Sequence, residues 1–107
     1  PFSIGPLRVQ NRLVMPPMAT NYATPEGFVT ERQIAYYGER AKGGTGYITV
    51  EHTGVLQQGK ASVNMLLIST DEHASKIATL IQSVHSLEGK IIVQINHAGR
   101  NTSSAVT

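Results

Sequence analysis

The stretch "LEGKIIVQINHAGR" (residues 87–100) indicates the fold class of this chain. Gly89 separates the end of a predicted helix from the run 91–95, which is short, apolar and rich in β-branched residues, as a buried strand is. The strand ends among strongly hydrogen-bonding side chains, namely Gln94, Asn96, His97 and Arg100. A buried strand with a polar carboxyl end is typical of a parallel α/β sheet that binds a ligand at that end.

The same alternation of strands and helices extends upstream of residue 87. Breakers such as Gly5-Pro6 and Pro16-Pro17 interrupt the apolar runs, and two segments carry apolar residues at helical spacing. We therefore expect, in chain order, a hairpin over 2–9, a strand over 13–15, a helix over 30–43, a strand over 47–50, a helix over 70–88 and a strand over 90–95. Strands that alternate with helices of this length form parallel βαβ units with right-handed crossovers.

Both helices carry a start signal. Thr30 is followed three residues later by Gln33, and Ser69 is followed by Glu72, so each pair predicts a capping box. The connection from residue 51 to residue 68 is longer than connections in compact domains usually are. It is therefore expected to be a functional loop or to hold small elements of its own.

Composition restricts the class of protein. The 107 residues suffice for one small domain, with 40% hydrophobic and 15% charged residues, as in globular proteins. The basic residues are scattered and the net charge is only +2, so no nucleic-acid partner is expected. No apolar run reaches the roughly 18 residues of a membrane span and there is no Cys, so we expect a soluble, cytoplasmic protein. Because the chain opens on Pro1 and not on Met, we interpret it as part of something longer.

Ligands of parallel α/β folds bind outside the carboxyl ends of the strands. That rule selects residues 16–20, residues 51–53 and residues 94–100, which should lie side by side. Gln94 has a neutral amide that both donates and accepts hydrogen bonds, and therefore suits a ring edge with a carbonyl beside an N–H. No phosphate-binding glycine motif follows a strand, and the four histidines lack metal-ligand spacing, so no metal site is expected. His97 and Arg100 are open between a structural role and a ligand contact. The structural role would be a polar cap at the strand end and its turn for His97, and an ion pair for Arg100.

Three motifs together resemble one enzyme family. The runs "NRLVMPPMAT" (11–20), "GERAKGGTGYITVE" (38–51) and "QINHAGR" (94–100) are similar, in order and spacing, to the N-terminal part of the Old Yellow Enzyme family of FMN-dependent oxidoreductases. The likeness extends over essentially all 107 residues and is greatest to the bacterial ene-reductase and 2,4-dienoyl-CoA reductase branch. The resemblance implies a (β/α)8 barrel, of which this chain would form an N-terminal hairpin and the first three βα units, a partial barrel.

The resemblance also implies roles for individual residues. The residues expected to bind the cofactor FMN are Pro16, Pro17, Met18, Ala19, His52 and Gln94. Pro16 to Ala19 would run along the flavin ring, His52 would sit beside it, and Gln94 would bind its pyrimidine end. Tyr22 would face bound substrate. The catalytic residues of the family lie downstream of this segment, so none is assigned here.

The activity that the resemblance implies is reduction of an activated C=C bond by hydride from reduced FMN, which NAD(P)H reduces in turn. The 107 residues alone are expected to be inactive, because a complete barrel has about 250 residues. A different hypothesis is a non-catalytic partial barrel that assembles with copies of itself through its exposed edges. A third is another FMN barrel of the dihydroorotate-dehydrogenase type.

Overall fold

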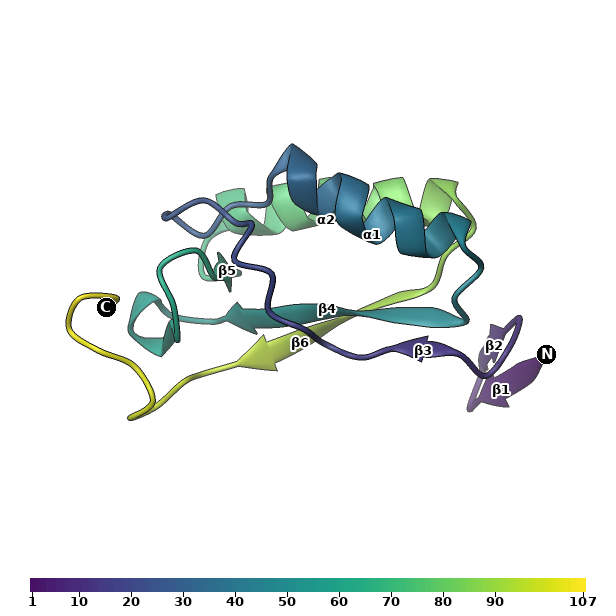
Figure 1. Ribbon diagram of the computed structural model, residues 1–107, viewed down its shortest axis with the longest axis horizontal. Coiled ribbons are helices and arrows are strands. Elements are labelled where there is room, and N and C mark those ends of the chain that lie inside the picture. The colour runs from purple at the N-terminus through teal and green to yellow at the C-terminus, as the bar shows by residue number, and fades with distance from the viewer.

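The computed structural model describes residues 1–107 and shows one sheet with two helices on one side and a separate small hairpin (Figure 1). In chain order the elements are β1 (Phe2–Ile4), β2 (Leu7–Val9), β3 (Val14–Met15), α1 (Glu31–Lys42), β4 (Tyr47–Gly54), the 3-10 turn η1 (Gln57–Gly59), β5 (Leu66–Leu67), α2 (Asp71–Ser86) and β6 (Ile91–Asn96). The order of helices and strands is the alternation that the sequence predicts.

Strand β4 is the centre of the sheet, and every strand that pairs with it runs parallel to it. β3 and β6 lie along β4, and the short β5 pairs with its last two residues. β1 and β2 form an antiparallel pair outside this sheet, at the end where β4 begins (Figure 1). The amides of Gln10 and Asn11 both donate to the Gly44 carbonyl, at 2.8 and 2.7 Å, and so fasten the hairpin to the loop before β4.

The core lies between the helices and one face of the sheet. Ile48 and Val50 of β4 contribute to it, together with Tyr37 of α1 and Leu80 and Val84 of α2. Leu80 has no exposed surface, and burial of such a side chain stabilises a fold by about 1.5–3 kcal/mol. The spacing of residues 77, 80 and 84 in α2 is the helical stripe that the sequence predicts.

The other face of the sheet is bare in this structure (Figure 1). Successive strand residues point to opposite faces, so Val14, Thr49 and Ile92 face away from the helices. Val14 and Ile92 are 44% and 46% exposed. A sheet with helices on one side and apolar residues on the other has the construction of a barrel wall, whose inner face packs against the inward-pointing side chains of the other strands.

The start of α1 has the expected capping box, whereas the start predicted for α2 is wrong. Thr30 Oγ1 accepts a hydrogen bond from the Gln33 backbone N–H. In α2, Thr70 and not Ser69 is the N-cap, and it accepts from the His73 backbone N–H at 3.1 Å. A tertiary contact explains the choice, because the His73 ring lies between Thr70 Oγ1 and the Glu26 carbonyl, 2.8 Å from each.

Strand β4 is longer than the predicted strand over 47–50, because it continues through a β-bulge to Gly54. Val50 pairs with Val93, and the next pair is Thr53 with Ile95, so two residues of β4 lie opposite one residue of β6. The following connection holds η1 and β5, which are the small elements that its length indicates.

Candidate functional site

The three segments expected to bind a ligand, residues 16–20, 51–53 and 94–100, lie together at the carboxyl end of the sheet. β3, β4 and β6 are parallel, so the chain leaves all three at the same edge. After β3, residues 16–19 run alongside β4 but do not pair with it as a strand. Met15 pairs with Ile48 at one end of this run, and the Thr20 side chain bonds to the Glu51 carboxylate at the other. Residues 16–19 are exposed over this whole span.

The bulge in β4 brings His52 and Gln94 to one face. Glu51 and His52 together lie opposite Gln94. The Glu51 side chain points to α1, where it contacts Tyr37, so His52 projects to the other face. Gln94 also projects there, because its neighbour Val93 packs against the core. Gln94 is exposed and its amide forms no hydrogen bond within the chain.

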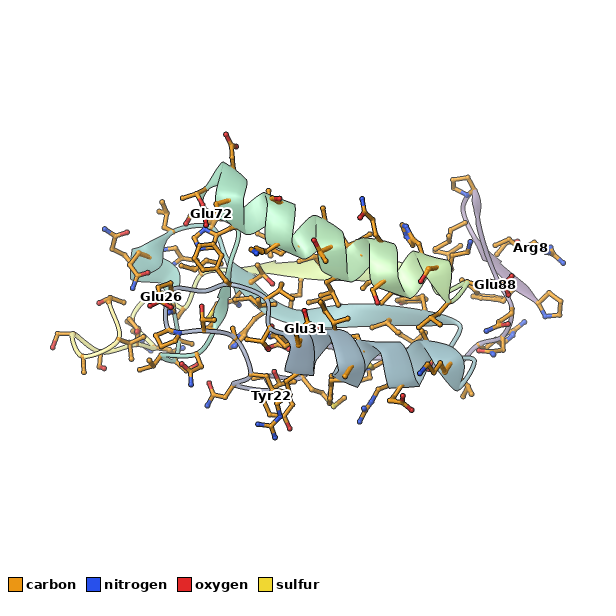
Figure 2. All side chains as sticks on the ribbon, turned by 90° about the horizontal axis from the view of Figure 1, so that it is seen from above. Arg8, Tyr22, Glu26, Glu31, Glu72 and Glu88 are labelled. Atoms are coloured by element: carbon orange, nitrogen blue, oxygen red, sulfur yellow. The ribbon has the colours of Figure 1, made fainter.

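Tyr22 lies apart from this pair, against α1. Its ring has the Arg32 guanidinium 3.7 Å from its centroid and the Tyr36 ring at 5.9 Å, nearly perpendicular. Figure 2 shows Tyr22 beside the first turn of α1, on the side away from α2. Its backbone is fixed by Thr30 Oγ1, which donates to the Tyr22 carbonyl at 2.7 Å. The phenol oxygen of Tyr22 has no partner within the chain.

A buried carboxylate stands directly behind this edge, within the segment 51–53 that is selected from the sequence but without a role assigned to it there. Glu51 is 1% exposed, and it accepts hydrogen bonds from Thr20, Gln33 and Tyr37. Burial, and next the hydrogen bond to Glu51, raise the pKa of Tyr37 far above that of a free phenol, so the phenol remains a donor. The signal in the sequence is a glutamate at the end of a β-branched, apolar strand, where such a residue is unfavourable without partners.

A buried lysine ties two loops of this edge together and was also missed. Lys60 is 1% exposed, and its ammonium donates to the carbonyls of Pro25 and Val63, both at 2.6 Å. Burial lowers the pKa of Lys60, and the charge of Glu26 opposes that shift. No pattern around "QQGKAS" distinguishes this lysine from a solvated one, because its partners are backbone carbonyls distant in sequence.

His97 stabilises the turn that follows β6. Its Nδ1 accepts from the Gly99 backbone N–H at 3.0 Å, and the Ala98 N–H donates to the Gly59 carbonyl at 2.9 Å. The ring lies so close to Gly59 that a Cβ there would be 2.9 Å from His97 Cδ2. Arg100 is exposed and forms no ion pair. The geometry therefore favours the turn-stabilising alternative for His97.

Other features of the molecule lie away from this edge. A hollow of about 440 Å³ lies at the opposite end of the sheet, between the hairpin and the end of α2, and includes Arg8, Glu88 and Lys90. Its lining is almost entirely polar, so it does not suit a flat aromatic ring. No group of His, Asp and Glu side chains is arranged to hold a metal ion. Neither helix has both the length and the apolar character needed to cross a membrane.

The edge fits the ring of a flavin better than its phosphate. A free amide at Gln94 and an exposed run stiffened by Pro16 and Pro17 provide a polar contact and a flat apolar border. The first turns of α1 and α2 lie at this end of the sheet (Figure 1), but the side chains of Thr30 and Thr70 already cap them, and no phosphate-binding glycine motif precedes either helix. The fold and the site thus define part of a parallel barrel that offers one border of a heteroaromatic ring site.

Comparison with known proteins places this chain in a family. It belongs to the NADH:flavin oxidoreductase / NADH oxidase family, which matches residues 1–106. The chain is 45% identical over 105 residues to an NADH oxidase of Thermoanaerobacter brockii, covering 97% of this chain and 16% of that protein. It is 38% identical over 94 residues to an NADH:acrylate oxidoreductase of Vibrio harveyi, covering 88% of this chain and 9% of that protein.

A solved structure supports the same assignment. The old yellow enzyme homologue of Zymomonas mobilis superposes with a TM-score of 0.93 at 32% sequence identity, over 99% of this chain and 29% of that one. The expected partial barrel, an N-terminal segment of a TIM barrel of the Old Yellow Enzyme type, is thereby confirmed. The chain spans less than a third of the length of each of these three proteins.

Proposed function

We propose that residues 1–107 form the first part of an FMN-binding barrel in an NAD(P)H-dependent oxidoreductase that reduces activated C=C bonds. The observation that carries the proposal is the bulge opposite Gln94, which places a free amide and His52 on one face beside the exposed run 16–19. Family membership supports the flavin, and the names of the NADH oxidase and NADH:acrylate oxidoreductase relatives support a nicotinamide donor and an activated alkene. The cytoplasmic location expected from the sequence belongs to the same proposal.

Within this proposal the residues bind and orient, and FMN supplies the hydride chemistry when it is bound. Gln94 matches the carbonyl and N–H of the flavin pyrimidine edge, because its own amide has both groups and no competing partner in the chain. Pro16, Pro17, Met18 and Ala19 border the ring with a backbone that two prolines keep rigid. His52 occupies the neighbouring position on the same face.

We propose Tyr22 as a contact to substrate. It follows Thr20 closely at the carboxyl edge, and its phenol oxygen is free of partners within the chain. The stacking of Arg32 on its ring keeps that phenol in one place on the α1 side. A contact from Tyr22 would therefore reach the part of a substrate that extends toward the start of α1.

The experiment compares Gln94→Leu with Gln82→Leu in the full-length protein that carries these residues. Gln82 is an exposed glutamine of α2, remote from the carboxyl edge, and gives a matched control. We expect purified wild type to carry FMN and to oxidise NADH or NADPH in the presence of an activated alkene such as acrylate. Gln94→Leu should weaken FMN binding by about tenfold, which corresponds to about 1.4 kcal/mol for a buried hydrogen-bond pair.

Two results would contradict the proposal. One is a wild-type protein without flavin absorbance after addition of FMN. The other is equal FMN affinity for the Gln94 and Gln82 variants, since the pyrimidine contact would then be absent.

Self-association of the 107-residue chain is a second candidate, favoured by its open edges. Leu13 and Ile95 are 70% and 58% exposed, and β3 and β6 each have one unpaired side. Exposed strand edges with apolar side chains are templates for pairing with another copy. Sedimentation of residues 1–107 should show dimers or larger species that Ile92→Lys diminishes, and a monomer at all concentrations would exclude this candidate.

A further inference from the structure

The buried carboxylate of Glu51 is bonded by three side chains from two separate parts of the chain. Thr20 Oγ1 is 2.8 and 2.9 Å from the two carboxylate oxygens, Gln33 Nε2 is 3.1 Å from Oε1, and the Tyr37 hydroxyl is 2.6 Å from Oε2. All three donors are uncharged, and no cation lies within ion-pair distance of the carboxylate. The carboxylate is therefore held by hydrogen bonds alone.

The direction of these hydrogen bonds is fixed by the remaining contacts of the donors. The Glu51 backbone N–H donates to the Tyr37 oxygen at 3.0 Å, so the phenol proton is free to point at the carboxylate. In the same way, the Tyr22 backbone N–H donates to Thr20 Oγ1 at 3.2 Å, so the threonine proton also points at Glu51. The network needs an acceptor with several lone pairs at residue 51, which an ionised carboxylate provides.

The network stands at the junction of the proposed flavin-contact segments. Thr20 directly follows the run 16–19, and His52 directly follows Glu51 in the bulge. The other two donors belong to α1, which packs on the opposite side of β4. A single side chain thus ties the end of the run 16–19 and the bulge to helix α1.

We infer that Glu51 is a positioning residue for the flavin-binding edge. It fixes the run 16–19 at one distance from β4, and it holds the bulge that turns His52 and Gln94 to the same face. Glu51 itself points away from that face and does not touch the ring. This role rests on the proposed function, since it concerns the cofactor that the edge receives.

The test uses Glu51→Gln in the full-length holoprotein. The amide nearly preserves the shape of the carboxylate but replaces one acceptor oxygen with an NH2 group, which then faces Gln33, Tyr37 or Thr20 donors. Val84→Ala is the control, because Val84 is a fully buried apolar residue in the last turn of α2, beside Gly89, and takes no part in the hydrogen bonds to Glu51. FMN affinity, the visible absorption and circular dichroism of the bound flavin, and the melting temperature are measured for both variants.

We expect Glu51→Gln to weaken FMN binding by tenfold or more and to change the visible dichroism of the flavin. Val84→Ala should lower the melting temperature and leave FMN affinity within twofold of wild type with an unchanged flavin spectrum. If both variants lose FMN affinity in proportion to their loss of melting temperature, Glu51 only supports the fold and the inference is overturned.

Thr20→Val provides a second variant if Glu51→Gln does not fold. It removes one donor and keeps the size of the side chain, while the bonds from Gln33 and Tyr37 remain. FMN affinity should fall by about threefold with little change in melting temperature, and an unchanged affinity and spectrum would overturn the inference. Failure of the proposed function is visible separately, because wild type itself would then bind no FMN.

Discussion

Replacement of Gly59 by Ala should destabilise the carboxyl edge by a predictable amount. The added Cβ would lie 2.9 Å from Cδ2 and 3.1 Å from Cγ of His97. Carbon atoms in ordinary contact are about 3.5 Å apart or more, so the ring must move by roughly 0.6 Å. That ring is not free to swing away, because its Nδ1 accepts from the Gly99 N–H.

The expected loss is about 1–3 kcal/mol of unfolding free energy, the usual effect of an added methyl group in a packed site. The upper part of this range applies if the shift also breaks the bond from the Ala98 N–H to the Gly59 carbonyl, worth about 0.5–1.5 kcal/mol. Urea unfolding followed by circular dichroism measures the difference.

Gly38→Ala is the matched control, since the same added methyl group should raise the unfolding free energy there instead of lowering it. Gly38 lies inside α1, and a Cβ would meet only Leu87 Cδ1, at an ordinary 3.6 Å. Alanine is favoured over glycine in a helix interior by about 0.8–1 kcal/mol, so this variant should be more stable than wild type.

The double variant Gly59→Ala/His97→Ala tests whether the contact with the His97 ring causes the loss of stability. If the clash is responsible, removal of the ring should make Gly59→Ala nearly neutral, with a coupling energy of about 1–2 kcal/mol. A Gly59→Ala variant as stable as wild type, or additive effects in the double variant, would refute the reasoning from the close contact.

Two further predictions concern the core and the buried lysine. Leu80→Ala should lower the unfolding free energy by about 2–5 kcal/mol, because Leu80 is fully buried between the helices and the sheet; a loss under 1 kcal/mol in urea unfolding would contradict this packing. For Lys60, burial lowers the pKa in the folded state below the ordinary 10.5, so the unfolded state binds more protons between the two values. The contribution of Lys60 to stability should therefore rise with pH through that window, and Lys60→Met should remove the rise; identical pH profiles of wild type and variant would exclude it.

The fold was largely predictable because its signals are local. Gly89 and the stripe at residues 77, 80 and 84 mark α2 without reference to any distant residue, and Thr30 with Gln33 marks the start of α1. The choice of Thr70 over Ser69 as N-cap was not predictable in this way. Both residues have a hydroxyl group, and the His73 contact to the Glu26 carbonyl decides between them.

The site was predictable only from two sources, the general rule that ligands bind at the carboxyl ends of parallel strands and the family resemblance. They select Gln94 and the run 16–19, and the assignment of these residues to FMN stays a prediction. The bulge, the partners of Glu51 and the burial of Lys60 could not be predicted, because each depends on contacts between residues more than ten positions apart. Such contacts leave no periodic pattern in the sequence.

The adjacent residues Gly59 and Lys60 bind two different loops, and this couples the motions of those loops. The Gly59 carbonyl binds the turn after β6, and the Lys60 ammonium binds the carbonyl of Pro25 in the loop before α1. A displacement of this dipeptide must therefore be transmitted to both loops at once. The carboxyl edge should fluctuate as a single cooperative unit, with shared rates of opening, and not as three independent loops.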